Sequence, residues 1–190
     1  MASYDPRVLP PDLPVPADDG AAAHLPGTRL PSLALPATDG EAVDLSARPG
    51  RSVVFVYPRT GRPGVENPGG EDSWNAIPGA RGCTPELCDV RDDHSALRDL
   101  GAAVFGLSTQ DTAYQREAVE RLGLTYPLLS DESLALAEAL RLPTFETDGL
   151  TLLRRLTLFV RDGVVADVIY PVFPPDEAAA RAAERLRGQE

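Results

Sequence analysis

Residues 52–57 read SVVFVY, a run of β-branched and aromatic side chains with no charge or turn residue inside it. Such a run predicts a strand that is buried on both faces, at the centre of a sheet. Residues 102–107 read AAVFGL and predict a second buried strand. Between the two runs, apolar residues recur at helical spacing over 87–97, after a plausible helix cap at Thr84. This order predicts two parallel strands joined by a helix.

Further elements are expected on both sides of this centre. Upstream, residues 31–45 surround a turn at Asp39-Gly40 and predict a small edge hairpin. Downstream, the pattern predicts, in order, helix 108–122, strand 126–129, helix 134–140, a hairpin of strands 153–160 and 164–170 around Asp162-Gly163, and helix 176–187. The whole order predicts an α/β fold whose sheet is parallel in its first part and is closed by an antiparallel hairpin.

The 190 residues are enough for one domain. Eight of the 19 prolines fall within the first 36 residues. Because proline fixes φ and lacks the backbone donor, we expect an extended proline-rich arm over residues 1–27 and the folded domain over 28–190. Residues 59–80 are rich in Gly, Pro and Asn and show no hydrophobic period. They predict a long loop, which is usually a lid or a binding element.

The charge and hydropathy of the chain exclude several kinds of partner. A formal net charge of −11 argues against nucleic acid and against an anionic membrane surface. No stretch approaches the ~18–20 apolar residues of a membrane span, and the first residues do not have the pattern of a signal peptide. We therefore expect a soluble, cytoplasmic protein.

Both cysteines, Cys83 and Cys88, lie in the segment GCTPELCDVRD at residues 82–92. In a reducing compartment, a close pair is typical of a catalytic, redox-active or metal-binding site. A zinc site made of this pair and His94 would lack a fourth ligand and the usual Cys-x2-Cys spacing, so no metal is expected. A cysteine at the start of a helix meets about half a positive charge and free N–H groups, which favour the nucleophilic thiolate.

This segment resembles the peroxiredoxins of the bacterioferritin-comigratory or Q type, whose motif reads G-C-T-x-x-x-C. The likeness extends from about residue 27 to the C-terminus and includes Tyr57-Pro58 and Leu129-Ser130-Asp131. The resemblance implies a thioredoxin-like fold, with a mixed central sheet flanked by helices, over residues 28–190. It also implies a peroxidatic Cys83, a resolving Cys88, and reduction of hydroperoxides by thioredoxin or glutaredoxin without a cofactor.

The expected chemistry needs a second thiol and a nearby positive charge. Attack on a peroxide leaves the cysteine as a sulfenic acid, and condensation with another thiol returns it to a recoverable state. For the charge, Arg154 and Arg155 are adjacent, so within a strand they would point to opposite faces. The resemblance selects Arg155, because the family's arginine stands two residues before a threonine, which here is Thr157.

The Pro-x3-Thr-x2-Cys motif of that family is not intact in this chain. Counting back from Cys83 places Ala80 where the threonine should stand and Ala76 where the proline should stand. Pro58 follows the central strand as the motif proline would. The simplest interpretation is an insertion over residues 59–80.

Several groups could position a peroxide in place of the missing hydroxyl. Thr60, Ser73 and a backbone N–H are candidates, whereas Thr84 follows the nucleophile but is expected to cap the helix. Trp74, the only tryptophan, either anchors the insertion or forms a wall of the peroxide pocket. We take Pro58, Thr84 and Trp74 as the candidate substrate-binding residues.

Two other functions fit a cysteine pair in this setting: a dithiol–disulfide oxidoreductase acting on proteins, and a redox-sensing module. The oxidoreductase would favour Cys-x2-Cys, which this chain does not have. If Cys83 and Cys88 lie in one regular helix, their Cα atoms are roughly 8–9 Å apart, beyond the ~7 Å limit for a disulfide. The first helical turn would then have to unwind before a disulfide could form.

Overall fold

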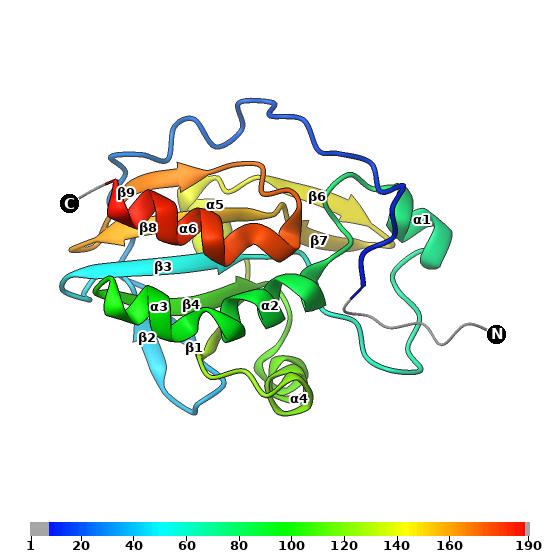
Figure 1. The fold of residues 1–190 in the computed structure, drawn as a ribbon, viewed down its shortest axis with the longest axis horizontal. Coiled ribbons are helices and arrows are strands. Elements are labelled where there is room, and N and C mark those ends of the chain that lie inside the picture. The colour runs from blue at the N-terminus through cyan, green and yellow to red at the C-terminus, as the bar shows by residue number, and fades with distance from the viewer. Residues whose placement is uncertain (1–7, 189–190) are drawn as a thin grey trace.

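A five-stranded mixed sheet lies at the centre of the computed structural model, which describes residues 8–188 (Figure 1). β3 pairs in parallel with β4 and β4 with β5, whereas β8 runs antiparallel to both β3 and β9. In spatial order the strands are β5 (Leu128–Ser130), β4 (Ala102–Ser108), β3 (Arg51–Val56), β8 (Leu156–Arg161) and β9 (Val164–Ile169). The predicted sheet, parallel in its first part and closed by an antiparallel hairpin, is confirmed.

The strand β3 occupies the middle of the sheet because both of its faces are apolar. Val53 and Phe55 face one hydrophobic cluster, and Val54 and Val56 face a second cluster on the opposite side. Successive residues of a strand point to opposite faces, so an uninterrupted apolar run can fill both.

Helices cover the first face of the sheet, and Figure 1 shows α2, α3 and α6 lying across it. The elements that bury apolar side chains there are α2 (Cys83–Asp92), α3 (His94–Asp99), α4 (Thr112–Leu122) and α6 (Ala178–Arg187), the last preceded by the 3-10 turn η1 (Pro175–Glu177). The second face is covered by α5 (Ala135–Leu140) and by the predicted edge hairpin of β1 (Ala34–Pro36) and β2 (Ala42–Asp44). This layered arrangement places the start of α2 beside the end of β3.

The stretch 59–80 is not a continuous loop, as the sequence predicts, because the helix α1 (Glu71–Ala76) forms inside it. Trp74 is buried and packs in a small cluster with Ala80 and Leu152. A six-residue helix is too short to be stable alone, and tertiary contacts of this kind hold it. The composition of the segment carries no sign of them.

A second hairpin, β6 (Thr144–Thr147) and β7 (Leu150–Leu153), is absent from the sequence prediction. Its turn residues, Asp148 and Gly149, both have positive φ, as in the Asp-Gly turns of tight hairpins. The expected strand 153–160 is therefore wrong at its start, because β7 ends at Leu153 and β8 begins at Leu156. Similarly, the expected helix over 84–97 is divided into α2 and α3 at Asp93.

Residues 8–27, which belong to the expected proline-rich arm, contain neither helix nor strand. They nevertheless lie along the domain: Leu25 and Ala22 are buried in the second cluster, and the Gly27 N–H donates to the Val165 carbonyl (2.7 Å). The first seven residues of that arm lie outside the described residues. The division of the chain at residue 27 stays a prediction.

Within residues 8–188, no helix is both long and apolar enough to cross a lipid bilayer.

Candidate active site

Cys83 is the first residue of α2, as expected for a cysteine at the N-terminus of a helix. Gly82 precedes it as the N-cap residue with φ 107°, a conformation that favours glycine. A Cβ at Gly82 would lie 2.4 Å from Pro175 Cγ, so the close approach of η1 also requires glycine. The prediction that Thr84 caps the helix is wrong, because the N-cap is Gly82, two residues earlier, and Thr84 lies within the first turn.

Two donors point at the Cys83 sulfur. Arg155 Nη2 lies 3.2 Å from Sγ, and the backbone N–H of Arg59 donates to Sγ over 3.4 Å. The thiol itself lies 3.6 Å from the Ala80 carbonyl oxygen, to which it can donate. Two N–H donors, one of them on a guanidinium, thus face the sulfur atom from the side of the connection before β8 and from the chain after β3.

Arg155 is only 3% exposed and is held from several sides. Its Nη1 pairs with Glu86 of α2, which is fully buried, so the two charges compensate each other. Its Nη2 also donates to the carbonyls of Gly79, Ala80 and Arg81 at 3.2–3.4 Å. This guanidinium therefore connects the chain before Cys83 with the helix after it.

The neighbouring Arg154 is directed elsewhere. Its Nε donates to the Thr144 carbonyl (3.1 Å), and its Cζ lies 6.0 Å from the centre of the Phe145 ring. The two arginines do not lie inside a strand but in the connection between β7 and β8. In this connection the Arg154 N–H donates to the Pro143 carbonyl. Of the pair, the structure brings Arg155 to the sulfur.

A pocket of about 610 Å³ opens beside Cys83. Its walls come from the first turn of α2, from Trp74 of α1, and from Arg59 and residues 61–67, together with Arg81 and Arg121. Trp74 is 2% exposed and its ring centre lies 6.3 Å from that of Phe145, so it both anchors the inserted segment and lines the pocket.

The other expected site residues fall in different places. Thr84 lines the pocket, while Pro58 is buried directly before Arg59. Neither Thr60 nor Ser73 is among the residues that line this pocket in the described part of the chain. Within residues 8–188, the expected alternative to the missing hydroxyl that donates to the sulfur is therefore a backbone N–H, that of Arg59.

Cys88 lies in the second turn of the same helix, and both cysteines are buried and outside any disulfide. Regular helical geometry separates their Cα atoms by roughly 8–9 Å, too far for a disulfide without movement of the backbone. The part of α2 around and after Cys88 is anchored, since Tyr126 Oη donates to the Leu87 carbonyl (2.9 Å) and Asp89 Oδ2 accepts the Ala179 N–H (2.8 Å).

Two ionisable groups near this helix are perturbed by burial. Burial raises the pKa of Asp89 to about 6. Neighbouring carboxylates also raise this pKa, whereas the hydrogen bond from the Ala179 N–H lowers it. Burial lowers the pKa of the Arg81 guanidinium, which pairs with Glu71 (2.7 Å) at the edge of the pocket.

His94 takes part in a polar contact outside the pocket. Its Nδ1 lies 2.8 Å from Thr125 Oγ1, and its ring packs edge-on against Tyr126. Among residues 8–188, no group of three or more His, Cys, Asp or Glu side chains is arranged to hold a metal ion.

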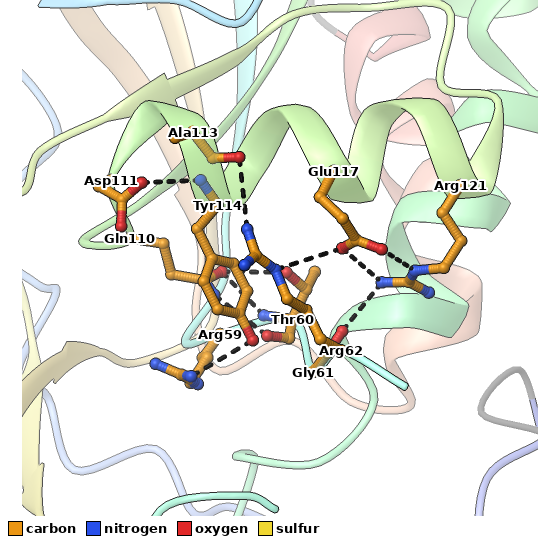
Figure 2. A network of polar contacts seen from close by, with 10 residues as sticks. All are labelled: Arg59, Thr60, Gly61, Arg62, Gln110, Asp111, Ala113, Tyr114, Glu117 and Arg121. Atoms are coloured by element: carbon orange, nitrogen blue, oxygen red, sulfur yellow. Dashed lines mark hydrogen bonds and ion pairs between the residues drawn. The ribbon is translucent and has the colours of Figure 1, made fainter. Parts of the chain in front are cut away.

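A polar network between the stretch 59–62 and the start of α4 could not be inferred from the sequence (Figure 2). Gln110 bonds to Thr60, while the guanidinium groups of Arg59 and Arg62 lie against the Tyr114 ring. The sequence predicts only a helix over residues 108–122, and contacts that join residues about 50 positions apart leave no periodic pattern.

The mixed sheet, the helices on its two faces and the cysteine at the N-terminus of α2 define a protein of the thioredoxin-like class. Within that class the chain belongs to the Redoxin family, which matches residues 25–184. The family resemblance and the fold inferred from the sequence are thereby confirmed.

Relatives named as peroxiredoxins match in sequence. The chain is 29% identical over 151 residues to the chloroplastic peroxiredoxin Q of Oryza sativa subsp. japonica, covering 80% of this chain and 61% of that protein. It is 38% identical over 58 residues to the peroxiredoxin Bcp of Bacillus subtilis (strain 168), covering 30% of this chain and 37% of that protein. The match thus spans about three fifths of the rice relative's length.

Solved structures agree with the fold. The peroxidoxin BcpB of Mycobacterium tuberculosis superimposes with a TM-score of 0.69 at 27% identity, covering 87% of this chain and 97% of that one. A peroxiredoxin Q of Xanthomonas campestris gives a TM-score of 0.65 at 21% identity, covering 84% and 94%.

Proposed function

We propose that this protein is a thiol-dependent peroxidase that reduces hydroperoxides through Cys83. The observation that supports it best is the pair of donors on the Cys83 sulfur, Arg155 Nη2 and the Arg59 N–H, beside an open pocket. These groups stabilise a thiolate where a small substrate can reach it. Membership of the Redoxin family and the peroxiredoxin relatives agree with this proposal.

In the first step, the Cys83 thiolate attacks one oxygen of the peroxide and the O–O bond breaks. The other oxygen leaves with the electron pair and takes up a proton, giving an alcohol or water, while Cys83 becomes a sulfenic acid. Arg155 and the Arg59 N–H remain close to the reacting atoms and can stabilise the negative charge as it moves.

In the second step, the Cys88 thiol condenses with this sulfenic acid, so that a disulfide forms and water leaves. An external dithiol protein, thioredoxin or glutaredoxin, then reduces the disulfide by thiol–disulfide exchange. The first turn of α2 has to open for the two sulfurs to meet.

The substrate class follows from the size of the pocket. A volume of about 610 Å³ is far larger than hydrogen peroxide needs and falls within the usual range of small-molecule sites. Trp74, Pro63 and Val65 give it apolar walls. We propose that both hydrogen peroxide and organic hydroperoxides react here, with Pro58, Thr84 and Trp74 shaping the site.

The test is consumption of peroxide in excess dithiothreitol. A peroxidase keeps turning over, whereas a sensor oxidises once and a dithiol oxidoreductase consumes no peroxide. Cys83→Ser should abolish consumption, and Cys88→Ser should still form a sulfenic acid that dimedone traps. Consumption by the Cys83→Ser variant at the unmodified rate would refute the proposal.

A further inference from the structure

The Arg59 N–H is a donor to the Cys83 sulfur, yet the stretch that carries it is neither helix nor strand. A backbone amide in irregular chain keeps its direction only if the peptides around it are fixed. On one side, buried Pro58 restricts the chain, because its ring fixes φ. On the other side, the next peptide needs a separate support.

Gln110 supplies that support. Its Oε1 accepts the Thr60 N–H (2.9 Å) and the Thr60 hydroxyl (3.1 Å), and its Nε2 donates to the Thr60 carbonyl (3.1 Å). The side-chain amide thus pairs with both backbone groups of one residue, as a neighbouring strand would. Thr60 is fully buried and Gln110 is 6% exposed, so water does not compete strongly for these bonds.

Gln110 is itself fixed to the sheet. Its backbone N–H donates to Ser108 Oγ (3.3 Å), and its carbonyl accepts the Ser130 hydroxyl (2.7 Å). The clamp therefore connects the ends of β4 and β5 to the residue that follows Arg59.

The face of α4 supports the same stretch through its side chains, as Figure 2 shows. Arg121 donates to the Gly61 carbonyl (2.9 Å) and pairs with Glu117, while the Arg62 guanidinium lies 3.8 Å from the centre of the Tyr114 ring. These contacts restrain residues after Thr60, whereas Gln110 fixes the peptide plane between Arg59 and Thr60.

We propose that Gln110 is a positioning residue for Cys83: its clamp on Thr60 holds the Arg59 N–H against the sulfur. The proposal rests on the proposed function for its catalytic meaning, and on the hydrogen bonds alone for its effect on the thiol. A glutamine suits this place because the clamp needs one acceptor and one donor on the same side chain.

The test uses the Cys88→Ser background, in which Cys83 is the only thiol. Gln110→Met keeps the length of the side chain and removes both polar atoms. We expect the pH profile of Cys83 alkylation by iodoacetamide to move upward by about one pH unit, because a donor to the thiolate is loosened. The rate of oxidation by hydrogen peroxide at pH 6 should fall about tenfold.

Gln115→Met is the matched control. Gln115 is another buried glutamine, whose Nε2 donates to the Leu129 carbonyl (2.8 Å) and to Ser108 Oγ (3.0 Å), the hydroxyl that also accepts the Gln110 N–H. It shares this anchor with Gln110, but within residues 8–188 its hydrogen-bond partners do not include the stretch 59–62. Its loss should lower the melting temperature by a similar amount while the alkylation profile stays in place. The charged groups around the sulfur, Arg155, Arg81 and Glu86, are the same in both variants.

If Gln110→Met and Gln115→Met lower the melting temperature equally and neither moves the profile, Gln110 is only structural and the proposal is overturned. Should Gln110→Met fail to fold, Gln110→Asn, shorter by one methylene, must move the profile part of the way. An unmoved profile in a folded Gln110→Asn protein also overturns it. Alkylation does not require peroxide. A shifted profile in the Gln110 variant, together with no peroxide consumption by the unmodified protein, would therefore refute the proposed function and still support the positioning role of Gln110.

Discussion

Arg155 has two partners, the Cys83 sulfur and the carboxylate of Glu86, and this double role determines what its removal does. We predict that Arg155→Ala slows oxidation of Cys83 by about a hundredfold, a usual loss for one electrostatic donor. It should also lower the free energy of unfolding by about 3 kcal/mol, because Glu86 would be left buried without its partner.

Arg154→Ala is the control for that prediction, since Arg154 contacts Thr144 and Phe145 and not the sulfur. Stopped-flow kinetics with hydrogen peroxide and urea unfolding measure the two effects. An equal loss of rate in both variants would show that the charge acts from a distance and that contact with the sulfur is unimportant.

Asp89 gives a prediction for pH. Burial raises its pKa to about 6 in the folded protein, whereas in the unfolded chain the carboxyl ionises near 3.8. Between about pH 4 and 6 the folded state binds more protons, so this group makes the protein less stable as pH rises through that window. Asp89→Asn, which still offers an oxygen to the Ala179 N–H, should melt higher than the unmodified protein above pH 6.

At pH 4 the two proteins should differ little in melting temperature, because the folded carboxyl is then neutral and the unfolded one is only about half ionised. Melting curves from pH 4 to 8 provide the measurement. Curves that stay parallel over the whole range would contradict the role assigned to Asp89.

At the scale of elements, α2 is fixed unevenly. After Cys88 it is held at Asp89, which accepts the Ala179 N–H, and at Arg91, whose Nη1 donates to the Leu122 carbonyl (2.6 Å). Directly before Cys88, Tyr126 Oη donates to the Leu87 carbonyl. The first turn has no side-chain cap. Opening a helix end is among the least costly local motions, so disulfide formation should open residues 83–87 and leave 89–92 in place.

Hydrogen exchange followed by mass spectrometry can test this prediction. Oxidation should speed up exchange in a peptide that covers residues 83–87, while exchange over 89–92 stays slow. Equal protection of the first peptide in both redox states, with the disulfide confirmed by mass, would mean that the turn does not open.

Elements whose own residues form an apolar run or an apolar period were predictable from the sequence. Elements that depend on contacts with distant residues were not. The runs at 52–57 and 102–107 became β3 and β4, since buried strands need the side chains that the sequence shows. The helix α1 depends on the packing of Trp74 and was missed. The turn at Asp148-Gly149 did carry a hairpin signal that the sequence analysis did not use.

The same division applies to the candidate site. Cys83 was placed at a helix start from local sequence, and Arg155 was singled out by a family pattern. A backbone N–H was among the expected candidates, but the sequence could not show that Arg59 carries it, because a backbone donor has no residue signature. Gln110 was beyond reach, because a pair 50 positions apart follows no period. The sequence thus indicated the candidate site side chains, Cys83 and Arg155, but not Gln110, which holds the backbone beside them.

At the scale of the whole molecule, residues 8–27 lie on the domain without forming regular structure. If they belong to the same folding unit, Leu25→Ala should lower the free energy of unfolding by about 3 kcal/mol, since Leu25 is fully buried. Val15→Ala, at a side chain that is 68% exposed, should change it by less than about 0.5 kcal/mol. Urea unfolding measures both, and a neutral Leu25→Ala would place the folding unit after residue 27.

The contacts of this N-terminal stretch also bear on the order of events during synthesis. Pro16 lies next to Gly79, Leu9 lies next to Gly82, and Gly27 bonds to Val165. A ribosome releases residues 9–27 long before the partners at 79–82, and longer still before Val165. Residues 9–27 must therefore wait for partners that are made later, and the surroundings of Cys83 are completed only after Arg155 has been added.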